Sequence, residues 1–399
     1  MGGTLKPLRI GVVGAGNISR AYLGTLPSLS NVEVTAVADL AGDRAAAAAA
    51  TVDGARALPV GELLAADDVD LVLNLTIPAA HAEVAHAAIT CGKHVYGEKP
   101  LAADTGSARS VLDFAERAGV RVGCAPDTVL GTGVQTARAM LDAGEVGTPV
   151  AATAFMVTPG HERWHPDPDF YYQPGGGPLL DMGPYYLTAL VTLLGPVRRV
   201  VGMSSTPRAR RIIGSGPRAG SEIEVNVATH VTGVLEHADG ALSTLVMSFE
   251  MWAGRLPRIE IYGTSGSLSV PDPNGFDGPV HIFRAGDSQW SPVAEAGGYR
   301  GASRGYGVSD LASALAAGTP HRADGQLAYH VLDVMESILA AASSGRAAEV
   351  ASSCERPAAV PLGTRPDEDR SDHSAIIPAG KPDQARSNNR APQDRGDGL

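Results

Sequence analysis

Short apolar runs alternate with helical patterns along the first 125 or so residues of the chain. We expect strands at the apolar runs 8–13, 32–38, 70–75, 94–96 and 120–124. Helical spacing of apolar residues predicts helices over 17–26, 45–50, 81–91 and 105–118. Strands and helices that alternate in this way predict a doubly wound, parallel α/β sheet with right-handed crossovers.

After about residue 128 the pattern changes to longer segments in which apolar and polar residues alternate. This alternation predicts strands at 150–157, 223–235, 241–249, 258–262, 267–270 and 280–283. The pair Asp239-Gly240 between two of these segments is a hairpin signal. Helical patterns cover 134–143 and 326–342. We therefore expect a C-terminal α+β domain with an open, mostly antiparallel sheet.

Composition changes again at residue 356. From there on the chain is rich in Pro, Asp, Arg, Ser and Asn and has little apolar content. Such a segment cannot bury enough surface to offset the entropy lost on ordering, so we expect it to be disordered. The expected organisation is 1–127 for the parallel domain, 128–355 for the α+β domain and 356–399 for a disordered tail.

The balance of charges excludes several classes of function. The 399-residue chain has a formal net charge of −11 at pH 7, which disfavours nucleic-acid and membrane-surface partners because both are anionic. We find no apolar stretch of about 18 residues and no signal-peptide pattern, so we expect a soluble, cytoplasmic protein. The three cysteines and the histidines show no metal-ligand spacing, so we expect no metal site.

A glycine-rich turn follows the first predicted strand. The segment Gly14-Ala15-Gly16-Asn17-Ile18-Ser19 matches the Gly-x-Gly-x-x-Gly/Ala pattern, with a small serine in third place. Such a turn lets a pyrophosphate approach free backbone N–H groups. Asp39 ends the second strand, 20 residues after Ser19, where a carboxylate accepts hydrogen bonds from an adenosine ribose. The combination predicts a Rossmann domain that binds NAD in preference to NADP. The alternative is a turn without a ligand, with Asp39 capping the next element.

Two further motifs supply candidate reactive groups. Gly97-Glu98-Lys99-Pro100 lies at the carboxyl end of a predicted parallel strand, where such sheets bind ligands; elsewhere it would indicate a surface loop. In segment 175–186, Asp181 can serve as the N-cap of a helix, and Tyr185 shares its helix face. Tyr186 continues an apolar stripe, so we interpret Tyr185 as facing a cleft and Tyr186 as core. Helix geometry alone equally allows Asp181 to be only a cap and both tyrosines to pack.

Together these motifs resemble the Gfo/Idh/MocA family of oxidoreductases, from about residue 8 to about residue 345. The resemblance includes Thr76-Ile77-Pro78, His81 and the turn 262–268. It implies a substrate hydroxyl, on a sugar or cyclitol, between the nicotinamide and Lys99, Asp181 and Tyr185. With the exposed sheet face it also implies a homodimer or homotetramer. It implies, finally, a dinucleotide across the strand ends that contacts Gly14, Gly16, Asn17, Ile18, Asp39, Thr76, His81, Glu98 and Lys99.

The chain departs from many relatives of that family at two places. Many members have histidine where this chain has Tyr185, and many have a more basic or aromatic loop where this chain has residues 125–128. We expect Asp127 in that loop to contact the substrate. An aromatic, polar loop before the glycine run contributes three more candidates, Trp164, His165 and Tyr172, beside His161 and Tyr171. For each of these aromatic residues, packing is the alternative interpretation.

The expected chemistry is hydride transfer between a nicotinamide cofactor and a hydroxyl or carbonyl group of a sugar, sugar derivative or cyclitol. We expect Lys99 to polarise the substrate oxygen and Tyr185 to transfer the proton. Burial and the positive nicotinamide would both lower the pKa of Lys99. The alternatives are a hydrolase or epimerase that recycles its NAD, and a non-enzymatic ligand sensor. The presence of Lys99, Asp181 and Tyr185 favours an enzyme.

Overall fold

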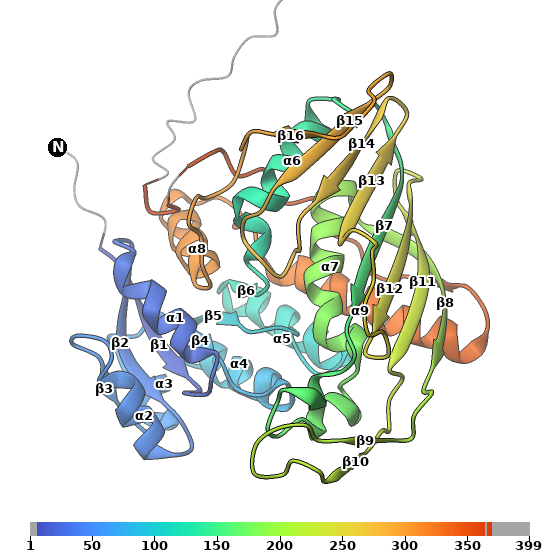
Figure 1. Cartoon of the computed structure of the whole chain (residues 1–399). Helices are drawn as coiled ribbons and strands as arrows, with labels where there is room; N and C mark the ends of the chain where they lie inside the picture. Colours follow the sequence, from blue (N-terminus) through green and yellow to red (C-terminus); the bar gives the residue numbers. More distant parts are fainter. Residues whose placement is uncertain (1–5, 364, 369–399) are drawn as a thin grey trace, which may run out of the picture. The chain divides into compact units, whose positions relative to one another are not determined.

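The computed structural model describes residues 6–363 and 365–368. The N-terminal sheet has six parallel strands in the order β3-β2-β1-β4-β5-β6 (Figure 1). Its order reverses between β1 and β4, as in a doubly wound sheet, so the predicted Rossmann architecture is confirmed. The strands are β1 (Leu8–Val13), β2 (Val32–Ala38), β3 (Arg56–Ala57), β4 (Leu71–Asn74), β5 (His94–Gly97) and β6 (Val122–Cys124).

Helices connect these strands and bury the apolar side chains that their spacing aligns. Helix α5 has the predicted bounds, because Asp104 caps its first turn by accepting from Ser107 N at 2.8 Å and Gly119 ends it in the left-handed region. The helices of this half are α1 (Ser19–Thr25), α2 (Gly42–Ala49), α3 (Val60–Ala65), α4 (His81–Thr90) and α5 (Thr105–Ala118).

The C-terminal sheet has nine strands in the order β16-β15-β14-β13-β7-β12-β11-β8-β17. Every pair is antiparallel except β7 with β12, which confirms a mostly antiparallel sheet. The predicted hairpin turn at Asp239-Gly240 joins β11 to β12. The strands are β7 (Pro149–Val157), β8 (Val197–Ser205), β11 (His230–His237), β12 (Leu242–Ser248), β13 (Ile259–Gly263), β14 (Gly266–Val270), β15 (Val280–Arg284), β16 (Ser291–Val293) and β17 (Ala348–Glu349).

The prediction of one strand over 223–235 is wrong. Strand β10 (Glu222–Glu224) pairs with β9 (Arg210–Ile212) in a separate two-stranded sheet, and β11 starts only at His230. Between them, the Asn226 backbone N–H bonds to the carbonyl of Tyr172 instead of to a neighbouring strand. Alternation of side chains predicts an extended backbone but not its pairing partner. We call β9, β10 and their connections (residues 206–228) the β9–β10 arm.

Four helices complete the C-terminal half: α6 (Thr132–Asp142), α7 (Pro178–Leu194), α8 (Tyr306–Ala317) and α9 (Gly325–Ser344). Helices α7 and α9 pack on one face of the large sheet (Figure 1). On the opposite face Met203, Val234 and Leu242 are exposed. Helix α7 starts earlier than predicted, at Pro178 with Gly177 as N-cap. Asp181 is therefore not the N-cap of α7 but a residue of its first turn. Among the described residues, no helix is long and apolar enough to cross a membrane.

The prediction that the chain is disordered from residue 356 is wrong for residues 356–363 and 365–368. Val360 is buried in the core, and its backbone N–H donates to the side-chain oxygen of Gln135. Gly363 exchanges backbone hydrogen bonds with the segment 298–300, and Asp367 accepts from Ser30 N at 2.7 Å. These hydrogen bonds and the burial of Val360 therefore order a segment whose composition alone predicts disorder. The remainder of the expected tail, 369–399, lies outside the described residues.

This segment gives a stability prediction. Deleting residues 361–399 removes the Gly363 and Asp367 hydrogen bonds, each of which contributes about 1 kcal/mol. We expect Tm, measured by calorimetry, to fall by about 5 °C or more. Deleting only 369–399 is the matched control, because it leaves these hydrogen bonds in place. Equal Tm values for the two truncations would contradict the packing of residues 361–368.

Candidate functional site

The glycine loop 14–19 follows β1 at the carboxyl edge of the parallel sheet. Gly14 has φ +104°, and a Cβ there would lie 2.6 Å from the backbone carbon of Leu75. A side chain is therefore excluded where the loop crosses β4. Gly16 is exposed, with open space where its Cβ would be, and Asn17 is exposed beside it. Ile18 is half-buried. The backbone of Gly16 and Asn17 is therefore accessible to a ligand at the surface of the loop.

Asp39 at the end of β2 is tied to this loop. Its carboxylate accepts from Ala15 N at 2.8 Å and from Ala41 N at 2.8 Å. Arg44 on α2 reaches back and pairs with the same carboxylate at 2.7 Å. Burial would raise the pKa of Asp39, but the backbone N–H groups and Arg44 hold it below its ordinary value. The carboxylate is therefore ionised next to the glycine loop, and Arg44 is the nearest cation to it.

Thr76 lies in the loop after β4, and His81 is the first residue of α4. The Thr76 hydroxyl donates to Asn74 Oδ1 at 2.6 Å. His81 is only 2% exposed, with Nδ1 2.6 Å from the Pro100 carbonyl oxygen and Nε2 3.1 Å from that of Thr76. The expectation that His81 contacts a cofactor directly does not fit this burial. Its ring instead ties the loop after β4 to the loop after β5, because both nitrogens face backbone carbonyls.

Glu98 is buried beneath the loop after β5. Its Oε1 accepts from the Tyr22 hydroxyl at 2.7 Å, and its Oε2 accepts from the Lys99 backbone N–H at 3.1 Å. Burial and the Glu98 charge raise the pKa of Tyr22 well above its ordinary value, so Tyr22 remains a donor. Glu98 thereby holds the backbone that carries Lys99. Tyr22 was not expected in the site, because no local motif links it to a residue 76 positions away.

Lys99 and Asp181 form the centre of the site. Lys99 Nζ lies 2.9 Å from Asp181 Oδ1 and 2.6 Å from the Asp181 carbonyl oxygen, and both side chains are 17% exposed. Burial would raise the pKa of Asp181, but Lys99 and His161 lower it to about 2. For Lys99, burial opposes the charge, yet the Asp181 carboxylate raises its pKa above the ordinary value. The expected lowering of the Lys99 pKa is therefore wrong for this state: the side chain is an ammonium held by a carboxylate.

The two adjacent tyrosines of α7 have different surroundings. The Tyr185 ring lies beside Lys99, with Nζ 5.4 Å from the ring centroid. Its hydroxyl lies 3.4 Å from a guanidinium nitrogen of Arg304, which also donates to Asn274 at 3.1 Å. Tyr186 is fully buried and its hydroxyl points to Asp272 at 3.5 Å. The helical phase predicted from the sequence therefore brings Tyr185, and not Tyr186, to Lys99.

Asp127 has a structural role that the sequence did not reveal. It is 1% exposed, and its Oδ2 accepts from Gly305 N at 2.9 Å and Gly307 N at 3.0 Å. Burial raises the pKa of Asp127 to about 6. The expectation of a substrate contact does not fit this position, because the carboxylate caps the start of α8. By doing so it holds the loop from which Arg304 extends to Tyr185.

The loop between β7 and α7 supplies an unexpected neighbour for Asp181. His161 Nε2 lies 3.1 Å from Asp181 Oδ2, opposite the oxygen that binds Lys99. Trp164 is 60% exposed and stacks edge-on against both His161 and His165. Tyr172 is fully buried and its hydroxyl donates to Glu162, a position that does not fit the expected contact with the substrate. Trp164 and His165 remain candidates for substrate contact.

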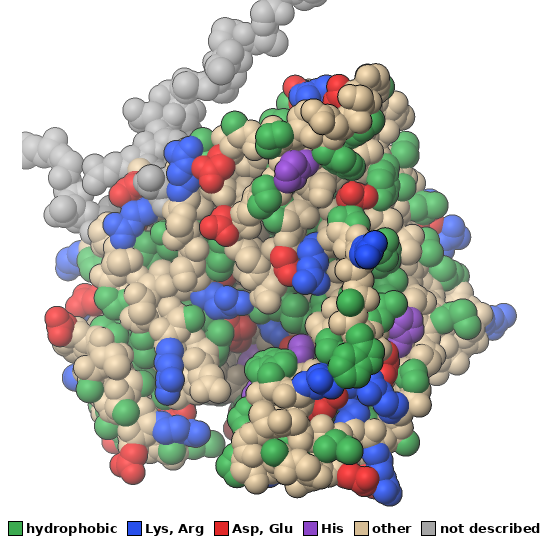
Figure 2. Space-filling view, viewed as in Figure 1, with side chains coloured by type: hydrophobic (Ala, Val, Ile, Leu, Met, Phe, Trp, Pro, Cys, Tyr) green, Lys and Arg blue, Asp and Glu red, His purple; other side chains and the backbone are tan. Residues whose placement is uncertain are grey.

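The surface near this loop is basic and aromatic. The Arg163 guanidinium lies over the exposed Trp252 ring, 4.4 Å from its centroid. Figure 2 shows basic and hydrophobic side chains side by side in the region above β9 and β10. Within the described residues, no group of acidic, histidine or cysteine side chains has the arrangement of a metal site.

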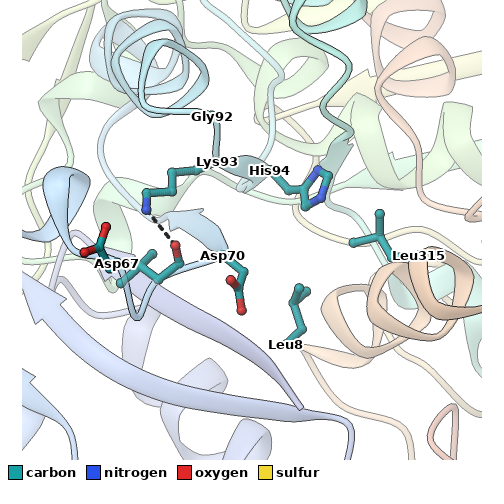
Figure 3. A pocket seen from close by; sticks show the side chains of 8 residues that line it. Leu8, Asp67, Asp70, Gly92, Lys93, His94 and Leu315 are labelled. Atoms are coloured by element: carbon teal, nitrogen blue, oxygen red, sulfur yellow. Dashed lines mark hydrogen bonds between the residues drawn. The ribbon is translucent and has the colours of Figure 1, made fainter. Parts of the chain in front are cut away.

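A cavity of about 400 Å³ lies at the opposite edge of the parallel sheet, at the amino ends of β1, β4 and β5 (Figure 3). Lys93 in its wall donates to the carbonyl oxygens of Ala66 and Val69, and Asp70 is paired with Arg9. Lys93 and Asp70 are thus already engaged by groups of the protein itself. Ligands of such sheets bind at the carboxyl ends of the strands, which is where the glycine loop and Lys99 lie. The cavity is therefore separate from the candidate site.

The parallel sheet, the glycine loop and the Lys99–Asp181 pair at its carboxyl edge define a dinucleotide-binding α/β protein. Comparison with known proteins agrees: residues 8–125 match the "Oxidoreductase family, NAD-binding Rossmann fold", and residues 134–269 match the "GFO/IDH/MocA C-terminal domain". The chain belongs to the Gfo/Idh/MocA family of oxidoreductases.

Its relatives include sugar-nucleotide reductases. A dTDP-3,4-didehydro-2,6-dideoxy-alpha-D-glucose 3-reductase of Streptomyces violaceoruber is 34% identical over 50% of this chain and 58% of its own length. The enzyme of the same name from Streptomyces antibioticus is 34% identical over 66% of this chain and 75% of its own. Levoglucosan dehydrogenase, solved in complex with NADH and L-sorbose, shares the fold with a TM-score of 0.74 and 20% identity, covering 87% of this chain and all of that one.

Proposed function

We propose that this protein transfers hydride between a nicotinamide cofactor and a hydroxyl or carbonyl group of a sugar, sugar derivative or cyclitol. The observation that carries the proposal is the Lys99 ammonium, held by Asp181 beside Tyr185 at the carboxyl edge of the parallel sheet. An ammonium in that place donates a hydrogen bond to a carbonyl oxygen or an alkoxide. The sugar substrates named for the relatives support this substrate class.

The glycine loop fits a dinucleotide. Gly14 removes the side chain that would block the turn, and Gly16 and Asn17 leave backbone exposed for a pyrophosphate. Asp39 would accept hydrogen bonds from the adenosine ribose, and Glu98 and Lys99 would lie near the nicotinamide end. Thr76 and Ile18 would border the cofactor, while the buried His81 holds the loops in place. When bound, the nicotinamide supplies or accepts the hydride.

The protein residues manage the substrate oxygen and one proton. Lys99 donates from its ammonium to that oxygen, and Asp181 fixes the ammonium from the opposite side. In oxidation, Tyr185 as phenolate accepts the proton that the substrate hydroxyl loses. Lys99 and Arg304 place positive charge on both sides of Tyr185, which stabilises negative charge on its oxygen when the proton leaves. In reduction the same groups act in reverse, with Tyr185 as the donor.

Cofactor choice follows from Asp39 and Arg44. A carboxylate that binds the ribose repels a 2′-phosphate, so we expect a higher kcat/KM with NAD than with NADP. Asp39→Asn keeps an acceptor for Ala15 N, removes the negative charge and releases Arg44. This variant should shift the kcat/KM ratio toward NADP by about tenfold or more.

Arg44→Gln is the matched control for this prediction, because it keeps the Asp39 charge and removes the cation. It should leave NADP a poor cofactor. A wild-type preference for NADP would show that Arg44 dominates the site and that Asp39 does not select the cofactor.

The proposed reaction is tested with a panel of sugars, polyols and their keto derivatives, incubated with NAD or NADH. We follow the absorbance of reduced nicotinamide and the identity of the product. Formation of NADH and a keto sugar in equal amounts supports the proposal. Product without net NADH would indicate a recycling hydrolase or epimerase instead, and binding without product would indicate a ligand sensor.

We further propose that the chain forms a homodimer or homotetramer through the large sheet. Met203 is 76% exposed, Leu242 48% and Val234 39%, on the face opposite α7 and α9. These side chains come from the neighbouring strands β8, β11 and β12. Contiguous exposed apolar side chains of this kind support burial against a second copy.

A further inference from the structure

His161 and Lys99 hold the same carboxylate from opposite sides. Asp181 Oδ1 accepts from Lys99 Nζ at 2.9 Å, and Asp181 Oδ2 lies 3.1 Å from His161 Nε2. Because the pKa of Asp181 is lowered to about 2, its carboxylate is ionised at neutral pH and acts only as an acceptor. His161 Nε2 must therefore carry a proton that it donates to Asp181.

The other ring nitrogen of His161 indicates which charge state is present. Nδ1 is buried and has no hydrogen-bond partner among the described residues. A proton on Nδ1 would be a buried donor without an acceptor, which is costly, whereas a lone pair there costs less. The ring is thus the neutral tautomer with its proton on Nε2. Rings of Phe249, Tyr171 and Trp164 surround it at centroid distances of 4.5, 4.6 and 5.3 Å and set its orientation.

A buried chain of hydrogen bonds holds the His161 backbone. Its N–H donates to the Tyr172 hydroxyl at 3.2 Å, and that hydroxyl donates to Glu162. Glu162 is paired with Arg211 at 2.8 Å, with both side chains at most 5% exposed. Arg211 belongs to the β9–β10 arm and also pairs with Glu250 at 2.5 Å. Buried ion pairs such as these fix one geometry, because breaking a pair leaves an uncompensated charge. The β9–β10 arm therefore fixes the backbone from which His161 reaches Asp181.

We propose that His161 is a positioning residue: its Nε2–H group orients the Asp181 carboxylate so that the other oxygen and the main-chain carbonyl hold the Lys99 ammonium toward the substrate. The inference rests on the proposed function in that Lys99 is the group being positioned. His161 does not accept the substrate proton in this arrangement, because the one hydrogen bond that its ring makes among the described residues is a donated one. Its role depends on a donor at that position and not on its ability to titrate.

The charged and titratable groups around His161 decide how pH affects this arrangement. Asp181 faces it from α7, with Lys99 behind that carboxylate. Tyr171 and Tyr172 face it from the following turn, and Glu162 with Arg211 lies beneath its backbone. Among them, Asp181 is the group whose pKa His161 lowers. Loss of the donor therefore raises the pKa of Asp181 and moves the acid limb of the pH profile upward.

Two substitutions separate the donor from the ring. His161→Gln keeps an N–H donor at the position of Nε2 but cannot titrate, and His161→Phe keeps the ring contacts but has no donor. We expect His161→Phe to lower kcat about 10- to 100-fold, the factor for one lost hydrogen bond to a charged group, and to raise the acid limb of kcat/KM. His161→Gln should keep both within about threefold of wild type, and NADH affinity should be unchanged in both variants.

Outcomes that contradict the proposal are distinct. Equal kcat values for His161→Phe and wild type would show that the hydrogen bond is dispensable. Loss of the acid limb in His161→Gln would show that the titration of His161 itself matters, so that it acts as a proton acceptor. His86→Phe is the matched control for the substitution, because His86 lies in α4, outside the site, where its ring contacts Phe114 of α5.

A spectroscopic measurement tests the proposal without any turnover. Long-range ¹H–¹⁵N correlation spectra of the full chain at pH 7 report the tautomer of each histidine, and His161→Gln identifies the His161 signal by its loss. We expect a proton on Nε2 and an unprotonated Nδ1. A proton on Nδ1, or on both nitrogens, would overturn the proposal. This result is independent of the substrate, so it stands even if no sugar is turned over and the proposed function fails.

Discussion

Lys99→Met should lower kcat by about 10³-fold while the Kd for NADH changes by less than about threefold. Methionine keeps the length of the side chain but removes the ammonium, so the substrate oxygen loses its donor. The glycine loop, Asp39 and Glu98 remain in place to bind the cofactor. Steady-state kinetics in the reducing direction and fluorescence titration with NADH measure the two quantities.

Stability is the control for this variant. Lys99→Met leaves Asp181 ionised, buried and paired only with His161, which destabilises the fold. The double variant Lys99→Met/Asp181→Asn removes both charges and should recover Tm without recovering kcat. Near wild-type kcat in either variant would show that Lys99 does not contact the reacting oxygen.

The pH dependence of the pair has a definite sign. The pKa of Asp181 is lowered in the folded state, so its contribution to stability is present above the ordinary carboxyl pKa and is lost as pH falls toward about 2. The pKa of Lys99 is raised, so the ammonium persists above the pH at which an ordinary lysine loses its proton. Activity that needs this ammonium is therefore retained under alkaline conditions.

Tyr185→Phe should lower kcat about 10²- to 10⁴-fold, the range for a general acid or base, with little change in Tm. The hydroxyl that it removes contacts the Arg304 guanidinium, and the ring that carries it lies beside Lys99 Nζ. Tyr186→Phe makes the same chemical change one residue later and serves as the matched control. Its hydroxyl contacts Asp272 at 3.5 Å and also Arg258, and not Lys99, so we expect kcat within about twofold and a small loss of stability.

The comparison of the two tyrosines can fail in two ways. A large loss of kcat in Tyr186→Phe would mean that α7 presents a different face to the substrate. Unchanged kcat in both variants would mean that the Lys99 ammonium alone handles the proton. In the second case Arg304 would act on the substrate or on Asn274 instead of on Tyr185.

The residues predicted best from the sequence are those that local geometry fixes. Gly14 is required by a turn with positive φ against β4, and Asp39 follows at the distance that one strand, turn and helix impose. Lys99 is placed by the end of a parallel strand. Helix periodicity placed Tyr185 rather than Tyr186 beside it. In each case a backbone constraint within one or two elements is sufficient.

Contacts between distant segments could not be predicted in this way. Arg304 meets Tyr185 across 119 positions, and His161 meets Asp181 through a loop with no repeating pattern. The burial of Tyr172 and Asp127 was also hidden, because their residue types suit a polar ligand and a buried network equally well. Only the fold shows that the Tyr172 hydroxyl donates a hydrogen bond to Glu162 and that the Asp127 carboxylate accepts hydrogen bonds at the start of α8.

The most direct test of hydride transfer at this site uses NADH that carries deuterium at both hydrogen positions of C4 of the nicotinamide. The protein is incubated with this cofactor and a keto sugar that the panel identifies, and the product is analysed by mass spectrometry. We expect one deuterium on the carbon of the new hydroxyl group for each NADH oxidised, and a rate of deuterium transfer about 10³-fold lower with Lys99→Met. A product without deuterium, or deuterium that remains entirely in the cofactor during turnover, would contradict hydride transfer between nicotinamide and sugar.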